Sequence, residues 1–340
     1  MTRRILLTGG GTGGHVYPAV AVAQAIRERE PDTEFLYCGV RGGIEQRIAE
    51  QNDIPFLAVI TAPFPGMKLL KLIRFTLRIG IGTLTAMFFL LSRRPQIIIA
   101  TGGYVAAPAV FAAVVLRTVR LLKVTIFVHE QNMRPGRLNS LVARFADAVG
   151  VSFFGSEDLL PGAVARYVGY PVRPSLRMAD ADGSPDVLKD IPAGRKIVLA
   201  FGGSQGARTV NRAVVDTLPM LSQRDDIFII HAVGRPQRSG YDGGVDVAAR
   251  LTSLGLGELS HCYRRVPYIE GIGAVYRAAS LVICRGGAGT VKEVCAVGRP
   301  AIVLPKAGLA GDHQVMNALV LQQAGAAEVL LEEPRVSVGL

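Results

Sequence analysis

The sequence predicts an α/β protein built from two doubly wound domains, each a parallel sheet flanked by helices. Short runs rich in Ile, Val and Leu alternate with longer helical patterns along the 340 residues, as expected for successive βαβ units. Glycine-rich turns follow four of these runs. A chain of this length is long for one domain and comfortable for two.

The first series of elements fills the N-terminal half. The expected strands are apolar and uninterrupted, which is typical of parallel strands covered on both faces. They span 5–8, 35–38, 56–60, 97–101 and 124–128, and the helical patterns between them span 17–30, 44–51, 68–91 and 105–115.

A second series begins after the proline-containing segment 170–177. Its expected strands span 196–201, 227–232, 281–285 and 301–305. We therefore predict two domains, 1–168 and 169–340.

The composition indicates a globular protein of a reducing compartment. Hydrophobic residues make up 49% of the chain and charged residues 19%, which excludes a disordered chain. The four cysteines, Cys38, Cys262, Cys284 and Cys295, form neither a C-x-x-C motif nor a zinc-like spacing. The N-terminal run of apolar residues is too short for a secretory signal.

The positive charge is concentrated in one stretch. The formal net charge is +11, and residues 54–129 contain no Asp or Glu but nine Lys and Arg residues. These cations are interleaved with Leu, Ile, Phe and Met rather than with aromatic stacking residues, which favours a membrane surface over nucleic acid.

The helix expected over 68–91 carries the densest part of this charge. Lys68, Lys71, Arg74 and Arg78 follow a spacing that clusters them on one helix face. Residues 79–91 then run without a charge, too few to span a bilayer, which takes about 20. The segment is either a buried core helix or an interfacial helix whose cations meet anionic headgroups.

The turn GGGTGG at 9–14 spells the dinucleotide pattern G-x-G-x-x-G but lacks its partner residue. The acidic residue expected at the end of the second strand is missing, since Glu34 stands at that strand's start. The turn therefore predicts backbone amides facing an anion. His15, at the start of the following helix, is either a turn residue or a neutral imidazole able to accept a proton.

The second domain repeats this arrangement. Ser204 and Gln205 lie in the turn GGSQGA, where backbone amides can bind a diphosphate. Glu293 follows the turn RGGAG, and a carboxylate there can accept hydrogen bonds from both hydroxyls of a ribose. Gln314 and Asn317 are one helical turn apart. Together these loops predict a nucleoside diphosphate site.

Five motifs carry a resemblance to a known family: GGGTGGHVYPA, HEQNMRPGRLN (129–139), GGSQGARTVN, YIEGIGAVYRAASLVICRGGAGTVKE (268–293) and DHQVMNA. In this order they resemble glycosyltransferase family 28, and within it the transferases that add N-acetylglucosamine to lipid I to make lipid II. The resemblance implies a GT-B fold, in which two Rossmann-like domains face each other across a cleft. It also implies inverting transfer from UDP-GlcNAc, held mainly by the C-terminal domain, to an undecaprenyl-linked acceptor on the N-terminal domain.

The same resemblance implies a peripheral protein on the cytoplasmic face of the bacterial inner membrane, at an anionic surface. It places the chain in peptidoglycan synthesis, and so in cell shape and division, with cell-wall or division proteins as possible partners. No nucleic acid, cofactor or metal is expected, because helix N-termini and loop amides can stabilise the departing UDP.

The donor-binding residues take their expected roles from matching positions of the family, whereas the candidate bases are chosen because both lie at strand ends of the acceptor domain. The catalytic base is expected to be His15, with Glu130 as the alternative. The donor-binding positions are spread along the chain: Thr12, Gly13 and Gly14 in the first turn; Asn132; Arg173; Ser204 and Gln205; Ile269 beside the uracil; Ala288, Gly289, Thr290, Val291, Lys292 and Glu293; and Gln314 at the sugar.

The chain departs from the family at three places. Tyr170 stands where an Asn is usual, and Ala288–Val291 reads Ala-Gly-Thr-Val instead of Ala-Leu-Thr-Val. The sequence stops at Leu340, where the family continues with helices that clamp the two domains, so we expect these helices to be missing. Three alternatives stay open: a related transferase with another lipid acceptor, an enzyme like the UDP-GlcNAc 2-epimerases, and a binding module with an inactive site.

Overall fold

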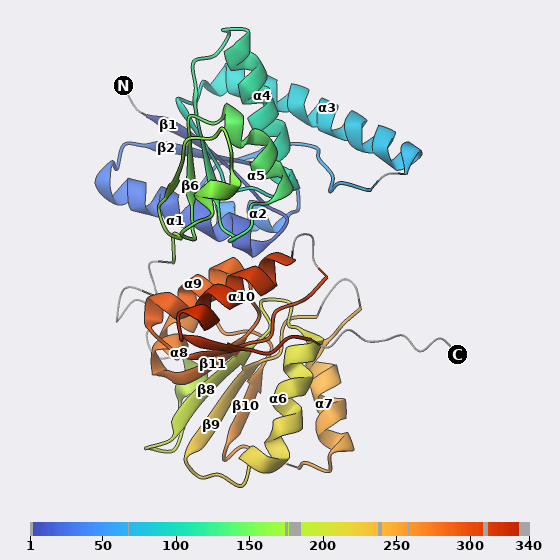
Figure 1. Cartoon of the computed structure of the whole chain (residues 1–340), viewed down its shortest axis with the longest axis vertical. Coiled ribbons are helices and arrows are strands. Elements are labelled where there is room, and N and C mark those ends of the chain that lie inside the picture. Colours follow the sequence, from blue (N-terminus) through green and yellow to red (C-terminus); the bar gives the residue numbers. More distant parts are fainter. Residues whose placement is uncertain are drawn as a thin grey trace. The chain divides into compact units, whose positions relative to one another are not determined.

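The computed structural model describes residues 3–66, 68–173, 176, 185–236, 240–257, 259–308 and 312–332. The chain divides into two compact units, Met1–Arg173 and Pro174–Leu340, a few residues beyond the boundary expected at 168. Each unit contains one parallel sheet with helices on both faces (Figure 1), so the predicted fold class is confirmed.

The N-terminal unit has a seven-stranded sheet in the order β3-β2-β1-β4-β5-β6-β7, with every neighbouring pair parallel. Its strands are β1 (Arg4–Thr8), β2 (Glu34–Gly39), β3 (Phe56–Ala58), β4 (Ile97–Ala100), β5 (Thr125–Glu130), β6 (Ala148–Val151) and β7 (Ala165–Tyr167). Its helices are α1 (Gly13–Arg29), α2 (Ile44–Glu50), α3 (Leu69–Arg93), α4 (Ala107–Thr118) and α5 (Arg137–Val142), with short 3₁₀ turns η1 (Tyr104–Ala106), η2 (Ala143–Phe145) and η3 (Glu157–Leu159).

Two hydrophobic clusters cover the two faces of this sheet. Successive side chains of a strand point to opposite faces, so Ile5 and Leu7 of β1 enter the cluster with α1 and α2, while Leu6 enters the cluster with α3 and α4. Strands buried on both faces explain why their sequences read as continuous apolar runs.

The C-terminal unit has a six-stranded sheet in the order β10-β9-β8-β11-β12-β13, again with parallel neighbours. Its strands are β8 (Lys196–Phe201), β9 (Ile227–Ala232), β10 (Tyr263–Val266), β11 (Ala279–Cys284), β12 (Ala301–Val303) and β13 (Ala327–Val329). Its helices are α6 (Arg208–Leu221), α7 (Gly243–Ser253), α8 (Ile272–Ala278), α9 (Ala288–Val297) and α10 (His313–Gln323), and η5 (Asp186–Leu188) precedes β8.

Both sheets reverse their strand order beside the first strand, between β1 and β4 and between β8 and β11. Connections on the two sides of such a switch point leave on opposite faces of the sheet, which opens a crevice at the carboxyl ends of the strands. The four glycine turns found in the sequence follow β1, β4, β8 and β11. They therefore form one pair at each switch point.

Helix α3 extends along α4 and beyond it (Figure 1). Its buried residues, Gly82, Ala86 and Leu90, recur every four positions and lie against the rest of the unit. Residues at three- and four-residue steps on the other side are exposed: Leu70, Ile73, Leu77, Ile81, Leu84, Phe88 and Leu91. Only 17% of its most apolar window is buried, so the interpretation of residues 79–91 as a buried core helix is wrong.

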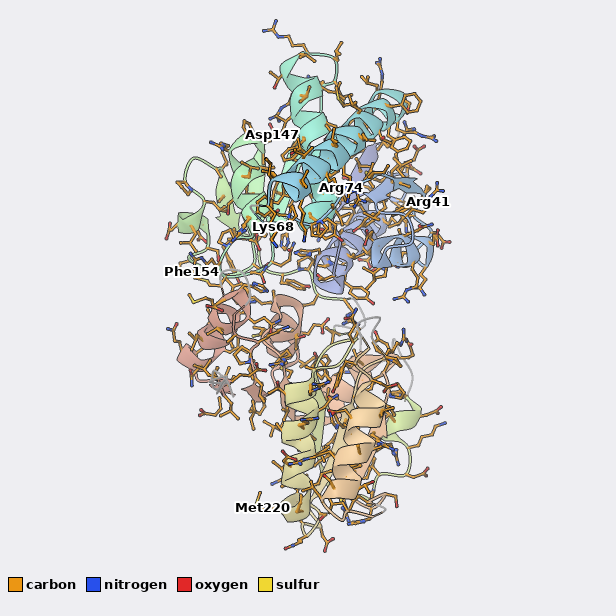
Figure 2. The ribbon with its side chains drawn as sticks, turned by 90° about the vertical axis from the view of Figure 1, so that its right-hand side faces the viewer. Arg41, Lys68, Arg74, Asp147, Phe154 and Met220 are labelled. Atoms are coloured by element: carbon orange, nitrogen blue, oxygen red, sulfur yellow. The ribbon has the colours of Figure 1, made fainter. Side chains whose placement is uncertain are left out.

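Three basic residues of α3 lie in its N-terminal part, Lys71, Arg74 and Arg78, and all three are exposed, as is Lys68 directly before the helix. Figure 2 shows Lys68 and Arg74 along this part of the helix. By length and composition alone, α3 could cross a membrane, and it is the one such helix among the described residues.

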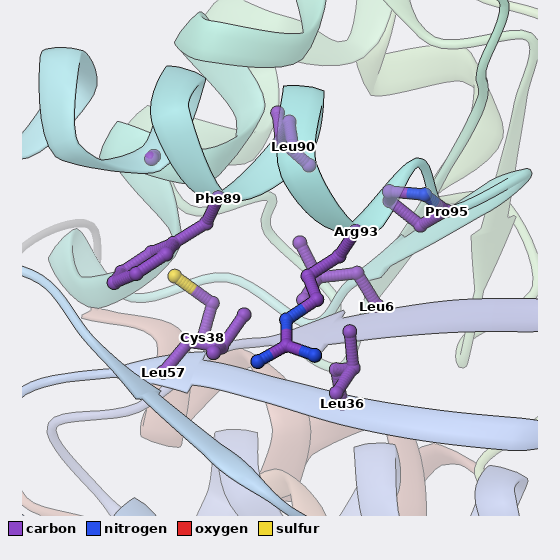
Figure 3. Close-up of a pocket in the computed structure, with 9 residues that line it drawn as sticks. Leu6, Leu36, Cys38, Leu57, Phe89, Leu90, Arg93 and Pro95 are labelled. Carbon is purple, nitrogen blue, oxygen red and sulfur yellow. The ribbon is translucent and has the colours of Figure 1, made fainter.

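The C-terminal part of α3 rests on the sheet across a narrow apolar crevice (Figure 3). Phe89, Leu90 and Arg93 line it from the helix, and Leu36 and Cys38 line it from β2. The crevice has no room for a water molecule, and no residue of the glycine turns lines it. It is a packing seam rather than a ligand site.

An added methyl group would have opposite effects on stability at two glycines of α3. A Cβ on Gly82 would lie 1.9 Å from the carbonyl oxygen of Ile60, whereas a Cβ on Gly80 would meet nothing within 4 Å. We expect Gly82→Ala to lower the free energy of unfolding by about 1–3 kcal/mol through overpacking. Gly80→Ala should raise it by about 0.5–1 kcal/mol, because alanine favours the helix. Urea unfolding of both variants measures the two effects. An equal change in the free energy of unfolding in both variants would contradict this packing of α3.

Candidate functional site

The two glycine turns of the N-terminal unit interlock at its switch point. The amide of Gly10 donates to the carbonyl of Gly102 at 3.3 Å, and the hydroxyl of Thr101 donates to the carbonyl of His15 at 2.6 Å. Gly103 has a φ of 73°, and a Cβ there would lie 2.3 Å from the carbonyl oxygen of Gly10. A side chain at this position would push the turns apart, so the close approach requires glycine.

The His15 side chain has a defined tautomer in this arrangement. Its Nδ1 lies 3.2 Å from the carbonyl oxygen of Gly10 and 3.2 Å from Oγ1 of Thr12. A carbonyl oxygen can only accept, so Nδ1 carries the hydrogen and the basic lone pair is on Nε2. His15 is the third residue of α1, where the helix N-terminus disfavours an imidazolium. The side chain is therefore suited to accept a proton.

Glu130, the alternative base, is held in a different way. It is 1% exposed at the end of β5. Its Oε1 accepts from the backbone amide of Asn132 at 2.8 Å and from its side-chain amide at 3.1 Å. Its Oε2 accepts from the amide of Gly136 at 2.9 Å and from the side chain of Asn139 at 2.8 Å. A carboxylate that orients the 131–139 loop so fully is less suited to proton transfer than His15 is.

Two further residues of the same unit, Arg173 and His129, have defined surroundings. The guanidinium of Arg173, expected at the donor phosphates, lies 4.8 Å from the ring centroid of Tyr17 on α1. His129 is buried, and its Nε2 lies 3.1 Å from the carbonyl oxygen of Gly169. Burial lowers the pKa of His129, so this imidazole is neutral and serves packing.

Two residues beside these turns were missed from the sequence. Tyr104 follows the second turn and lies against Gly11, with 38% of its surface exposed. Partial burial and the nearby charge of Glu45 raise its pKa. Glu45 is 2% exposed and accepts the amide hydrogen of Val40 at 3.1 Å. The turn G-G-Y after an expected strand was the available signal for Tyr104, whereas nothing in the local pattern marked Glu45.

The C-terminal unit places its predicted donor residues at its own switch point. Ser204 and Gln205 are exposed in the turn after β8. Glu293 lies on α9, is 7% exposed and accepts a hydrogen bond from the hydroxyl of Tyr276 at 3.2 Å. That bond uses one carboxylate oxygen and fixes the direction of the other.

The remaining predicted donor residues lie around the turn that opens α9. Ala288 and Val291 are buried on the inner face of the helix, whereas Gly289, Thr290 and Lys292 are partly exposed. Burial lowers the pKa of Lys292. Ile269 is buried after β10, and Oε1 of Gln314 accepts the amide hydrogen of Lys306 at 3.0 Å. Strand ends and helix starts thus gather these side chains at one edge of the sheet.

No group of three or more His, Cys, Asp or Glu side chains suited to a metal occurs in the part of the chain that the structure describes. An Asp-x-Asp pair, Asp180 and Asp182, lies outside the described residues. The expectation of a site without a metal therefore stays a prediction.

A buried polar network supports the turn after β8. His231 is fully buried on β9, with Nδ1 2.9 Å from the hydroxyl of Tyr263 and Nε2 3.1 Å from Oδ1 of Asn211. The side chain of Asn211 also donates to the carbonyl of Val233 at 2.9 Å. Burial is the main cause that lowers the pKa of His231, and the charge of Arg265 lowers it further, to about 3.

Both halves of the chain match known protein families. A family described as the glycosyltransferase family 28 N-terminal domain matches residues 5–151. The glycosyltransferase family 28 C-terminal domain matches residues 197–336. The two matches fall on the two sheets.

Full-length relatives agree with these matches. A protein of Desulforudis audaxviator (strain MP104C) is 35% identical over 342 residues, covering 99% of this chain and 87% of the relative. It is named UDP-N-acetylglucosamine–N-acetylmuramyl-(pentapeptide) pyrophosphoryl-undecaprenol N-acetylglucosamine transferase. The crystal structure of Acinetobacter baumannii MurG superposes with a TM-score of 0.67 at 27% identity, over 97% of this chain and 85% of that one.

Similar architecture extends beyond these relatives. A structure from Listeria monocytogenes, described as a UDP-N-acetylglucosamine 2-epimerase, has a TM-score of 0.64 at 15% identity. It covers 96% of this chain and 84% of that chain. At this identity the likeness shows the fold alone.

The His231 network makes the stability of the C-terminal unit depend on pH. The folded pKa of about 3 lies below the unfolded value of about 6.5, so the unfolded state binds more protons between these values. Stability is therefore complete above pH 6.5 and falls as the pH drops. Between pH 7 and pH 5 we expect a loss of about 2 kcal/mol from this residue. Denaturant unfolding of the wild type and of His231→Gln at both pH values measures it, and an equal pH dependence in the two proteins would contradict it.

Proposed function

The chain belongs to glycosyltransferase family 28, and on that premise we propose that it transfers N-acetylglucosamine from UDP-GlcNAc to lipid I. The product is lipid II, and the reaction serves peptidoglycan synthesis. The observation that carries this proposal is the similarity to relatives named for this activity over 99% of the chain. It favours this function over another lipid acceptor and over an epimerase, whose likeness is limited to the fold.

The C-terminal unit supplies the donor site. Glu293 accepts the ribose hydroxyls, with its direction set by Tyr276, and Ile269 lies beside the uracil. The amides of the 202–207 turn and the N-terminus of α6 face the diphosphate, where a positive helix end favours an anion. Ala288, Gly289, Thr290, Val291 and Lys292 shape the turn around the nucleoside, and Gln314 contacts the sugar.

The N-terminal unit supplies the acceptor site and the base. Nε2 of His15 takes the proton from the 4-hydroxyl of the N-acetylmuramyl sugar, whose oxygen attacks the anomeric carbon of N-acetylglucosamine. The bond from that carbon to the diphosphate oxygen breaks at the same time, so the configuration inverts and UDP leaves with the electron pair. Thr12, Gly13 and Gly14 close on the donor, together with Asn132 and Arg173.

Stabilisation of the leaving group comes from dipoles that are already oriented. Backbone amides and helix N-termini aimed at the developing charge need no reorganisation during the reaction. Ser204 and Gln205 add side-chain donors at the same turn. No step in this scheme requires a metal or a cofactor.

Helix α3 binds the membrane that carries the acceptor. Its exposed apolar stripe, Leu70 to Leu91, enters the interface, and Lys71, Arg74 and Arg78 contact anionic headgroups at its edge. These three cations and the buried positions Gly82, Ala86 and Leu90 favour a helix lying in the interface over one crossing it. The protein is thus peripheral, on the cytoplasmic face where UDP-GlcNAc is available, and cell-wall or division proteins are possible partners there.

Loss of the base should slow transfer without weakening donor binding. For His15→Ala we expect kcat to fall about 10²- to 10⁴-fold, the usual contribution of a general base, and the rate to lose its dependence on imidazole ionisation. The Kd for UDP should stay within a factor of two, because the residues that bind the uridine in this scheme, Glu293 and Ile269, lie in the other unit. UDP release with a soluble lipid I analogue measures the rate, and the exposed His261→Ala provides the control. Near-normal turnover at saturating acceptor would show that His15 is not the base.

Membrane binding should depend on charge and on the apolar stripe. Each basic residue near an anionic surface contributes about 1 kcal/mol, so Lys71→Gln, Arg74→Gln and Arg78→Gln together should weaken binding to phosphatidylglycerol vesicles about 100-fold. The matched control removes the same charge from the other unit by Arg212→Gln, Arg224→Gln and Arg250→Gln. Co-sedimentation at low salt measures both. Equal binding of the two triple variants would overturn the role of α3.

A further inference from the structure

The segment that follows β13 turns back across the carboxyl edge of the C-terminal sheet. The amide of Leu330 donates to the carbonyl of Val303 on β12 at 2.9 Å. Two residues later, Glu332 reaches Arg285, which directly follows β11. The segment therefore crosses the edge of the sheet where both donor turns lie.

Glu332 contacts residues that flank both of these turns. Its Oε1 accepts from the guanidinium of Arg285 at 2.5 Å, and the side chain of Thr209 lies beside the same carboxylate. Arg285 directly precedes the turn 286–287 that opens α9, and Thr209 lies in the first turn of α6, directly after the turn 202–207. One carboxylate thus connects the chain segments on the two sides of the switch point.

The Arg285 side chain is anchored on two sides. Besides Glu332, its guanidinium donates to the carbonyl of Leu304 at 2.8 Å. Only 13% of the Arg285 side chain and 27% of the Glu332 side chain are exposed. This pair is therefore more shielded from water and salt than a surface ion pair, and its geometry is better defined.

A displacement of Arg285 would be passed directly to the nucleoside turn. The next residue, Gly286, is packed so closely that a Cβ would lie 2.2 Å from the carbonyl oxygen of Gln314, and its own carbonyl accepts from the side chain of Asn317 at 3.1 Å. The turn has little room to adjust by itself. Its position, and that of Glu293 on the helix it opens, depends on the residue before it.

We propose that Glu332 is a positioning residue of the donor site, which holds the 202–207 and 286–287 turns in register through Thr209 and Arg285. The ligand that depends on it is a nucleoside diphosphate, so the inference rests on the donor site of the proposed function. With both turns fixed before the ligand arrives, binding does not have to order them, and affinity is gained through that preorganisation.

The test compares Glu332→Ala and Glu332→Gln with Asp216→Ala in the full-length protein. Asp216→Ala removes the more exposed pair with Arg250, at 2.7 Å between α6 and α7 of the same unit, and so controls for the loss of an ion pair. Calorimetric titration with UDP gives Kd without requiring transfer. Steady-state rates with UDP-GlcNAc and a soluble lipid I analogue give KM for each substrate and kcat.

For Glu332→Ala we expect the Kd for UDP and the KM for UDP-GlcNAc to rise about 10-fold or more, as for loss of a charge-assisted hydrogen bond. The KM for the acceptor should stay within a factor of two. Glu332→Gln keeps acceptor and hydrogen-bonding capacity and should recover part of the donor affinity, while Asp216→Ala should bind UDP like the wild type.

Two results would overturn the inference. One is a Glu332→Ala variant that binds UDP within a factor of two of the wild type. The other is a variant whose melting temperature falls while its KM values for donor and acceptor change equally, since that pattern marks a purely structural role. Failure of the wild type to bind UDP would instead count against the donor site itself, and so against the proposed function.

Discussion

The close approach of backbone to backbone at the two switch points is the constraint on which the rest of the structure depends. Strand order reverses beside β1 and beside β8, so the chain leaves neighbouring strands toward opposite faces and exposes peptide groups at the strand ends. In the N-terminal unit this packing leaves no space for a Cβ on Gly103. In the C-terminal unit the turn after β8 also packs closely against the end of β9, where a Cβ on Gly206 would lie 2.0 Å from the carbonyl oxygen of Val233. Side chains there would separate the turns and move His15 and Glu293 from their positions.

Three carboxylates hold the backbone around these turns in place: Glu45 and Glu130 are buried, and Glu332 is largely shielded. Glu45 binds the amide of Val40, Glu130 binds four N–H groups, and Glu332 joins Arg285 to Thr209. Each is paired with donors, as a buried charge must be. These three carboxylates thus act on the backbone of the sites, whereas Lys71, Arg74 and Arg78 are exposed on α3.

The sequence predicted the sheets well because parallel strands buried on both faces have an unmistakable apolar pattern. Four short strands, β6, β7, β10 and β13, were not predicted, because each contains a Gly, Arg or Glu instead of an uninterrupted apolar run. The start of α3 was also predicted, but the pattern could not tell a buried apolar face from an exposed one, which depends on what packs against the helix. Glu130 shows the same limit at the site. Its place at a strand end was visible, but the four N–H groups that bind it come from Asn132, Gly136 and Asn139, and spacing does not encode how the loop and α5 bring them there. The roles of the individual site residues remain predictions.

The position of Glu332 after the last strand has a consequence for how the protein is made. A chain emerges from the ribosome N-terminus first, and domains fold as units during synthesis. All strands of the N-terminal sheet lie before residue 168, so that unit can fold while the other half is still being translated. The turns after β8 and β11 emerge well before Glu332 does. They can be linked through Glu332 only after it has emerged as well. A nascent chain can therefore fold its N-terminal unit early, and it gains its full affinity for the nucleotide only after Glu332 has emerged.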